Sequence, residues 1–271
     1  MDAAYLYLDL LKQVLTRNGF DENVPLTGTG WKRHVIRPAQ RLVGSRGVQL
    51  TAHRPASTLE RQRAEGTYWP TDAETMIGLK RLDNLQMCIE TSIADGTPGD
   101  LIETGVWRGG ATIFMRAVLA AHGVTDRTVW VADSFHGLPK PDADRYPADE
   151  GDTVWTAQHL AISADEVRAN FERYHLLDDQ VSFLEGWFAD TLPTAPIERL
   201  AVARLDGDMY GSTWDAITVL YPKLSVGGFL IVDDYYALDG CRRAIDDYRE
   251  REGISDPIEV IDWTGVYWRR S

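Results

Sequence analysis

The chain has 271 residues, of which 44% are hydrophobic and 25% are charged, and its formal net charge is −13. This length suits one α/β domain with additions and is short for two independent domains. The acidic balance argues against nucleic acid or an anionic membrane as a partner.

Further features of the sequence predict a cytoplasmic protein. No segment approaches the ~20 consecutive apolar residues that a membrane span needs. The start of the chain lacks the basic and apolar regions of a secretion signal. The two cysteines, Cys88 and Cys241, lie in apolar helical patterns. We therefore expect buried thiols there and no disulfide or metal site.

The first part of the chain predicts a helical extension (residues 1–97) ahead of the main domain (residues 98–271). Apolar residues recur at helical spacing in two stretches, and Thr71 and Glu74 have the spacing of a capping box before the second. The stretches are Tyr5, Leu8, Leu11 and Leu15, and then Ile77, Leu82, Leu85, Ile89 and Ile93.

A basic segment, Trp31–Arg63, lies between these two helices and contains a single acidic residue, Glu60. We expect it to be irregular and to form an ordered arm or a contact between subunits. Its aromatic residues are too sparse for a single-stranded nucleic acid site. Because its composition differs from that of the acidic remainder, we predict a homo-oligomer.

From Asp100 onwards short apolar strands alternate with helical patterns, which predicts a mostly parallel sheet with helices on both faces. The expected strands are Leu101–Thr104, Thr128–Asp133, Val181–Glu185, Leu200–Asp206 and Gly228–Asp233, followed by an antiparallel hairpin of Ile258–Asp262 and Val266–Arg269. The acidic insertion Pro139–Gln158 is too long for a simple connection, and it is a candidate lid.

A glycine-rich turn follows the first strand, where an open α/β sheet binds its ligands. It reads Glu103-Thr104-Gly105-Val106-Trp107-Arg108-Gly109-Gly110, and this spacing differs from the G-x-G-x-x-G of a dinucleotide site. A pyrophosphate needs several backbone N–H groups at a helix N-terminus, whereas S-adenosylmethionine has no phosphate. The turn therefore favours S-adenosylmethionine, whose amino group Glu103 can face.

The next two strands supply further candidates for this cofactor site. Asp133, followed by Ser134, ends the second strand, where a carboxylate can accept hydrogen bonds from both ribose hydroxyls. The third strand leads into Gly186, Trp187 and Phe188, where an aromatic pair can stack on adenine. The cofactor residues expected from the strand ends are Glu103, Gly105, Trp107, Gly109, Asp133, Ser134, Gly186, Trp187 and Asp206.

Carboxylates follow the fourth and fifth strands, which we expect to be neighbours. Asp206 ends the fourth strand, and Asp233 and Asp234 end the fifth. Carboxylates so close together repel one another unless a cation or protons intervene, and oxygen ligands suit Mg²⁺. We therefore predict Mg²⁺ at Asp206, Asp233 and Asp234, with helix capping as the alternative. Asp208 is a ligand, a second base or a cap, and we rank it behind Asp206.

These motifs together resemble the macrocin O-methyltransferase family, whose members methylate deoxysugars attached to macrolides, aminocoumarins and related antibiotics. The matching strings are Leu101–Gly110, Val131–Phe135, Asp206–Gly211 and Val232–Tyr235. The similarity runs from about Tyr68 to Arg270, with a shorter match at Leu6–Leu10. The basic stretch Thr27–Ala64 is longer than the family pattern, which leaves substrate size and subunit arrangement open.

The resemblance implies a class I methyltransferase fold with a seven-stranded sheet, Mg²⁺ dependence, and an oligomer whose N-terminal region helps to close the active site. It also implies that Thr75 and Met76 lie over cofactor and sugar. Asp206 would hold the metal and serve as the base as well. The expected substrate is a small-molecule glycoside: a deoxysugar hydroxyl made more acidic by Mg²⁺ would receive the methyl group.

Three other functions remain alternatives. A catechol-type O-methyltransferase would use the same metal chemistry. A nicotinamide-dependent reductase is disfavoured by the glycine spacing, and a binding module without activity is disfavoured by the acidic cluster. His136 and His159 are alternative bases.

Overall fold

The computed structural model describes residues 2–26, 33–45 and 47–271. Its α-helices are α1 (Ala3–Leu15), α2 (Arg33–Gly44), α3 (Glu60–Ala64), α4 (Leu79–Ala94), α5 (Gly110–Ala121), α6 (Ala164–Arg173), α7 (Phe188–Thr191), α8 (Tyr210–Leu220) and α9 (Asp239–Glu252). Its strands are β1 (Glu22–Pro25), β2 (Thr51–Arg54), β3 (Asp100–Thr104), β4 (Val129–Asp133), β5 (Val181–Glu185), β6 (Leu200–Leu205), β7 (Leu224–Val232), β8 (Glu259–Val260) and β9 (Val266–Arg269).

Seven of the described strands form one sheet in the order β5-β4-β3-β6-β7-β9-β8. The pairs among β3 to β7 are parallel, and β9 pairs antiparallel with both β7 and β8. This confirms the predicted fold class and the closing hairpin. The chain runs outward from β3 to β5 and then returns to place β6 on the other side of β3. The carboxyl ends of β3 and β6 therefore flank the switch point, where such sheets bind ligands.

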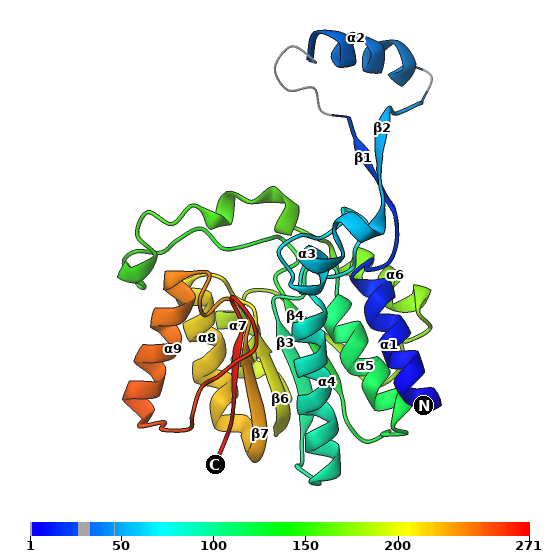
Figure 1. Ribbon diagram of the computed structural model, residues 1–271. Coiled ribbons are helices and arrows are strands. Elements are labelled where there is room, and N and C mark those ends of the chain that lie inside the picture. Colours follow the sequence, from blue (N-terminus) through cyan, green and yellow to red (C-terminus); the bar gives the residue numbers. More distant parts are fainter. Residues whose placement is uncertain (1, 27–32, 46) are drawn as a thin grey trace.

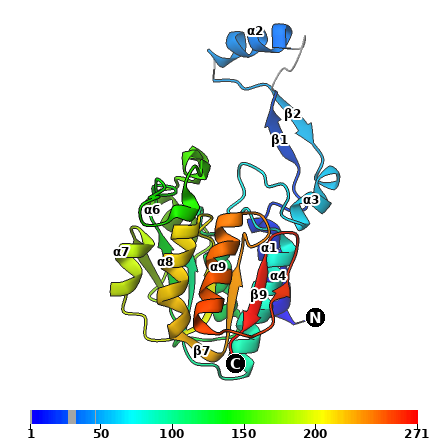
Figure 2. The ribbon, with the colours of Figure 1, turned by 90° about the vertical axis from the view of Figure 1, so that its left-hand side faces the viewer.

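Helices cover both faces of the sheet, as Figures 1 and 2 show. Alternate residues of a strand point to opposite faces of the sheet and belong to two different buried clusters. Leu101 belongs to the cluster that includes residues of α1, α4, α5 and α6. Ile102 belongs to the cluster that includes residues of α8 and α9. A strand that is apolar on both faces must lie inside a three-layer domain. Cys88 and Cys241 are buried free thiols, as predicted. No helix in the described chain is long and apolar enough to cross a membrane.

The N-terminal helices belong to the same core as the sheet. α1 packs against α5, and α4 packs against β6 and β7. Leu8, Leu11 and Leu15 of α1 are buried in the cluster that contains Leu101. The helical character of the extension is thus confirmed, and the division at residue 97 stays a prediction.

The basic segment forms an arm that rises from the domain (Figures 1 and 2). β1 and β2 pair antiparallel from Glu22–Arg54 to Pro25–Thr51, and α2 lies at the far end. The prediction of an irregular segment is therefore wrong for the described part, because pairing with β1, outside the segment, orders β2. Trp31, Lys32 and Arg46 lie outside the described residues.

The predicted capping box at Thr71 and Glu74 is also wrong. The helix begins at Leu79, behind the extended residue Gly78. The Glu74 carboxylate forms an ion pair with Arg173 of α6 at 2.8 Å, and the Glu74 carbonyl accepts a hydrogen bond from Gly110 N at 2.9 Å. The two Glu74 groups that a capping box needs are therefore used elsewhere, because the carboxylate pairs with Arg173 and the backbone N–H donates to the Leu15 carbonyl at 3.0 Å.

Candidate active site

The glycine turn after β3 is shaped by its neighbours at the switch point. Gly105 has φ +85°, and a Cβ on it would collide with the carbonyl oxygen of Asp206, the residue directly after β6. Trp107 has φ +48°, and its indole Nε1 donates to the carbonyl of His159 at 2.9 Å. Gly109, with φ +82°, precedes the first residue of α5. The turn therefore needs glycine at position 105, because the backbone after the neighbouring strand β6 comes so close.

Asp133, at the end of β4, is fixed by the same turn. Its Oδ2 accepts from Val106 N at 2.8 Å, and its Oδ1 accepts from Phe135 N at 2.7 Å. Burial raises the pKa of this carboxyl, and the backbone donors oppose that shift. Each carboxylate oxygen accepts more than one hydrogen bond, so an ionised Asp133 keeps acceptor capacity for two hydroxyl groups.

The start of α5 has no room for a pyrophosphate. Gly110 N donates to the Glu74 carbonyl, and a Cβ on Gly110 would stand 2.5 Å from that oxygen. The segment before α4 thus occupies the position where a dinucleotide would place its phosphates. This packing disfavours a nicotinamide cofactor independently of the glycine spacing.

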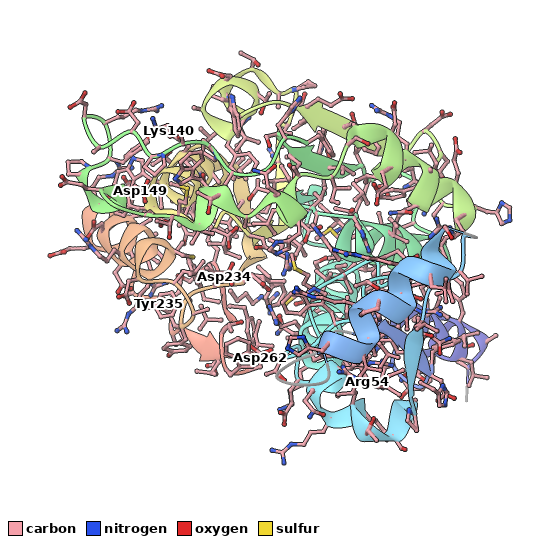
Figure 3. All side chains as sticks on the ribbon, turned by 90° about the horizontal axis from the view of Figure 1, so that it is seen from above. Arg54, Lys140, Asp149, Asp234, Tyr235 and Asp262 are labelled. Atoms are coloured by element: carbon pink, nitrogen blue, oxygen red, sulfur yellow. The ribbon has the colours of Figure 1, made fainter. Side chains whose placement is uncertain are left out.

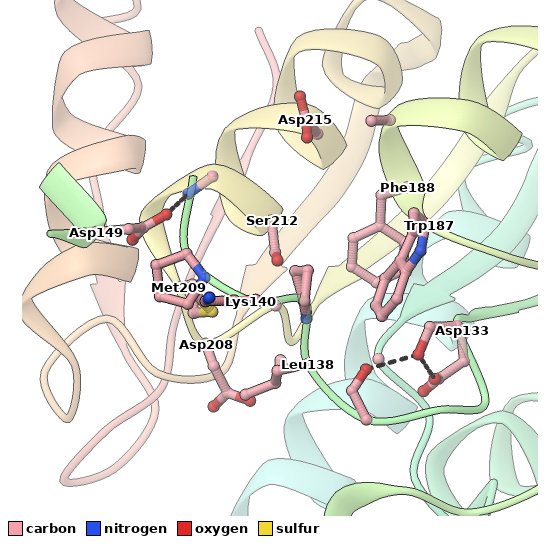
Figure 4. A pocket seen from close by; sticks show the side chains of 18 of the residues that line it. Asp133, Leu138, Lys140, Asp149, Trp187, Phe188, Asp208, Met209, Ser212 and Asp215 are labelled. Carbon is pink, nitrogen blue, oxygen red and sulfur yellow. Dashed lines mark hydrogen bonds between the residues drawn. The ribbon is translucent and has the colours of Figure 1, made fainter. Parts of the chain in front are cut away.

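A cavity of about 290 Å³ opens over the carboxyl ends of β3, β4 and β6. Figure 4 shows Asp133 and Trp187 at one end of the cavity and Asp208 at the other. Ser212 and Asp215 of α8 lie above them in this view. The candidate lid, Pro139–Gln158, contributes Lys140, among other residues, to the wall. The size is at the lower end of the range for small-molecule sites.

Seven of the predicted cofactor residues line this cavity and four do not. Those that line it are Met76, Gly105, Trp107, Asp133, Ser134, Trp187 and Asp206. Among the described residues Thr75, Glu103, Gly109 and Gly186 lie outside the lining. Gly186 N donates to the Asp133 carbonyl at 2.9 Å, and Thr75 is buried, with its Oγ1 accepting from Ile77 N at 3.2 Å. As for the two histidines, His136 and His159 do not line the cavity in the described structure.

Glu103 points to an arginine on the neighbouring strand. Its Oε1 accepts from Arg204 Nη1, and both side chains are almost fully buried. Its Oε2 is buried, and the described structure gives it no hydrogen-bond partner. Burial raises the pKa of Glu103 to about 8, although Arg204 acts in the opposite direction.

Asp233 lies between two arginines beneath the cavity. Arg204 Nη2 donates to its Oδ1, and Arg81 Nη1 of α4 donates to its Oδ2. Arg81 also pairs with Asp262, at 3.0 Å. Burial alone would raise the pKa of Asp233, but the two guanidinium groups outweigh burial and lower it. Asp233 as a metal ligand stays a prediction, since an ion would have to compete with these contacts.

Asp206, Asp208 and Asp234 form the closest group of carboxylates, which we call the acidic triad. One oxygen atom from each lies within 4.8 Å of the others. The structure thus brings the predicted residues Asp206 and Asp234 together, and the third member of the group is Asp208 instead of Asp233. In Figure 3 Asp234 lies between the lid and the arm. Burial raises the pKa of all three, that of Asp208 to about 8, and repulsion from Asp233 acts in the same direction on each.

The two arginines that pair with Asp233, Arg204 and Arg81, were not among the residues predicted for the site. Arg204 interrupts an otherwise apolar strand that is buried throughout. A charged residue at such a position requires a buried partner. That signal is present in the sequence, whereas the position of Arg81 depends on how α4 packs on the sheet.

A seven-stranded sheet in this order, with a cofactor cavity at its switch point and no room for a pyrophosphate, defines a class I methyltransferase. The profile of the macrocin-O-methyltransferase (TylF) family matches residues 4–270. The chain belongs to this family, and it is an S-adenosylmethionine-dependent O-methyltransferase.

Similar proteins support this assignment. The 8-demethyl-8-(2,3-dimethoxy-alpha-L-rhamnosyl)-tetracenomycin-C 4'-O-methyltransferase of Streptomyces olivaceus is 54% identical over 100% of this chain and 94% of that protein. The mycinamicin III 3''-O-methyltransferase of Micromonospora griseorubida is 57% identical over 80% of this chain and 86% of that protein. The solved structure of the O-methyltransferase NovP has 48% identity and a TM-score of 0.82, and 99% of each chain is covered.

Proposed function

We propose that this enzyme transfers a methyl group to a hydroxyl of a deoxysugar on a glycosylated natural product, and that the reaction depends on Mg²⁺. One relative named above acts on a rhamnosyl group attached to a tetracenomycin, and another acts on a mycinamicin. The observation that supports the metal is the acidic triad, a group of three carboxylates of which two, Asp206 and Asp208, line the cofactor cavity.

The donor set fits a hard divalent cation. The acidic triad offers carboxylate oxygens only, and these are the ligands that Mg²⁺ prefers. Burial and repulsion from Asp233 raise the pKa of each of the three carboxyl groups, so ionising them together is costly without a positive charge nearby. Asp206, Asp234 and either Asp208 or Asp233 would hold the ion. When bound, Mg²⁺ lets these groups ionise and makes a nearby hydroxyl more acidic.

The residues of the cavity position the two reactants. Asp133 would accept hydrogen bonds from the ribose of S-adenosylmethionine, and Trp187 would pack on its adenine. A carboxylate of the acidic triad takes the hydroxyl proton while the oxygen bonds to the methyl carbon and the carbon–sulfur bond breaks. Because the sulfonium already activates the methyl group, the main contribution of the protein is orientation and exclusion of water.

The structure favours Asp208 over Asp206 for the proton transfer. Asp206 Oδ2 is engaged by Arg204 at 2.9 Å. No ion pair in the described part of the chain involves Asp208, which also lines the cavity. An acid without a fixed arginine partner is the stronger proton acceptor, because the cation stabilises the ionised form. The resemblance implied Asp206, so the two residues need to be compared directly.

Chelation tests the metal. EDTA should abolish methyl transfer, and added Mg²⁺ should restore it, while calorimetry should show nearly unchanged affinity for S-adenosylmethionine because Asp133 belongs to another strand. Asp206→Asn should raise the Mg²⁺ concentration needed for half-maximal activity, because a metal ligand is weakened. Asp208→Asn should lower kcat at saturating Mg²⁺ by roughly 10²-fold or more, as loss of a general base does. Full turnover in EDTA would contradict the Mg²⁺ dependence and would mean that the O-methyltransferase works without a metal.

A further inference from the structure

The lid reaches α8 through one buried carboxylate. Asp149 is 3% exposed. Its Oδ1 accepts from Tyr210 N and its Oδ2 accepts from Gly211 N, both at 2.8 Å. These are the first two N–H groups of α8, and the residue before them, Met209, provides no side-chain cap. The lid therefore supplies the cap that the helix lacks in its own sequence.

Close packing surrounds this contact. A Cβ on Gly211 would collide with the ring of Tyr146 in the lid. One turn further along α8, Asp215 accepts from the Tyr146 hydroxyl and from Arg145 Nη2, the latter at 2.9 Å. The lid is thus held on α8 at two places: Asp149 binds the first turn, which the Tyr146 ring also contacts, and Asp215 binds the lid one turn further along.

The first turn of α8 directly continues the loop that carries Asp206 and Asp208. Asp208 has φ +58°, a backbone conformation that a non-glycine residue keeps only when its surroundings impose it. Met209 N donates to the Gly207 carbonyl at 2.6 Å, and a Cβ on Gly207 would stand 3.2 Å from Thr213 N. The shape of this loop therefore depends on the position of the first turn of α8.

We propose that Asp149 is a positioning residue that couples closure of the lid to the shape of the loop that carries Asp206 and Asp208. When the lid closes, the Asp149 carboxylate caps α8, and a negative charge at a helix N-terminus is stabilising. The capped turn holds Asp206 and Asp208 at the cavity. When the lid opens to admit cofactor and acceptor, the cap is released. Asp206 and Asp208 are then held in position only while the lid covers the cavity. This coupling does not depend on whether the reaction requires Mg²⁺.

Hydrogen exchange measures the cap directly. S-adenosylhomocysteine, the product that fills the cofactor site, should favour the closed lid and slow exchange at Tyr210 and Gly211 by about tenfold or more. In Asp149→Ala both amides should exchange fast with and without this ligand. Asp152→Asn is the matched control, because Asp152 Oδ1 accepts from Val154 N within the lid. It should keep the slowing seen in the wild type.

Kinetics separates positioning from simple stabilisation. Asp149→Ala should lower kcat at least tenfold at saturating S-adenosylmethionine, with a smaller change in cofactor affinity by calorimetry. If Asp149→Ala does not fold, Asp149→Asn keeps one acceptor oxygen and should show an intermediate loss of kcat and an intermediate rise in exchange. Wild-type kcat in the variant that was tested would overturn the proposal. So would amides of Tyr210 and Gly211 whose exchange in the wild type does not respond to the ligand.

Discussion

Replacing Arg204 by methionine should destabilise the fold strongly. Arg204 is fully buried, and its guanidinium pairs with Glu103, Asp206 and Asp233 on three adjacent strands. Burial of unpaired carboxylates is costly, and removing one partner of a buried ion pair typically costs about 3–5 kcal/mol. A domain has about 5–15 kcal/mol of stability in all. The variant should therefore lose a large fraction of its free energy of unfolding.

Urea unfolding followed by tryptophan fluorescence measures this loss, with an unchanged slope showing that the same transition is observed. Arg61→Met is the matched control, because Arg61 forms an exposed pair with Glu65, and its effect should stay within about 0.5 kcal/mol. The Arg204→Met loss should be larger at pH 8 than at pH 6, since protonation relieves unpaired carboxylates. A loss below about 1 kcal/mol would refute a buried ionised network.

Three further predictions follow from the site and the arm. Asp133→Ala should weaken S-adenosylmethionine binding at least about tenfold in calorimetry, because hydrogen bonds to a charged acceptor contribute about 1.5–3 kcal/mol each. In the folded protein the pKa of Glu103 is about 8, above its ordinary value of 4.5. The protonated form therefore stabilises the fold below pH 4.5, and this contribution is lost as the pH rises through 8. Glu103→Gln should therefore gain stability relative to the wild type between these values, by up to about 1.4 kcal/mol per pH unit, in urea unfolding at each pH. The enzyme should be a homo-oligomer in light scattering, and replacing residues 26–50 by an Asn-Gly turn between β1 and β2 should weaken the assembly.

Each of these has a clear contrary result. Unaltered affinity in Asp133→Ala, or tight binding of NAD, would contradict the cofactor site. A stability difference between wild type and Glu103→Gln that does not change with pH would mean that Glu103 keeps its charge throughout. A monomer at micromolar concentration would contradict the oligomer.

The strands and the glycine turn could be predicted because their signals are local. Short apolar runs predict β3 to β7, and the spacing of Glu103, Gly105 and Gly109 disfavours a dinucleotide turn. The acids at the ends of β6 and β7 follow from the alternation of strands and helices, since adjacent parallel strands end at the same edge.

Contacts between distant segments could not be predicted in this way. Glu74 has the residue type and spacing of a capping box, but its carboxylate pairs with Arg173 and its backbone N–H donates to the Leu15 carbonyl. Glu103 faces Arg204 because the two lie side by side in the register of β3 and β6. Asp149 caps a helix that begins 61 residues later. Such pairings depend on tertiary packing, which overrides local propensity.

Mass spectrometry of the reaction product shows whether the enzyme methylates a sugar hydroxyl and whether it needs Mg²⁺ to do so. The enzyme is incubated with S-adenosylmethionine that carries a trideuterated methyl group, with Mg²⁺, and with a rhamnosylated polyketide or its aglycone. We expect one trideuteromethyl group on the sugar fragment of the glycoside, none on the aglycone, and none after EDTA treatment. Label on the aglycone, or equal label with and without Mg²⁺, would contradict it.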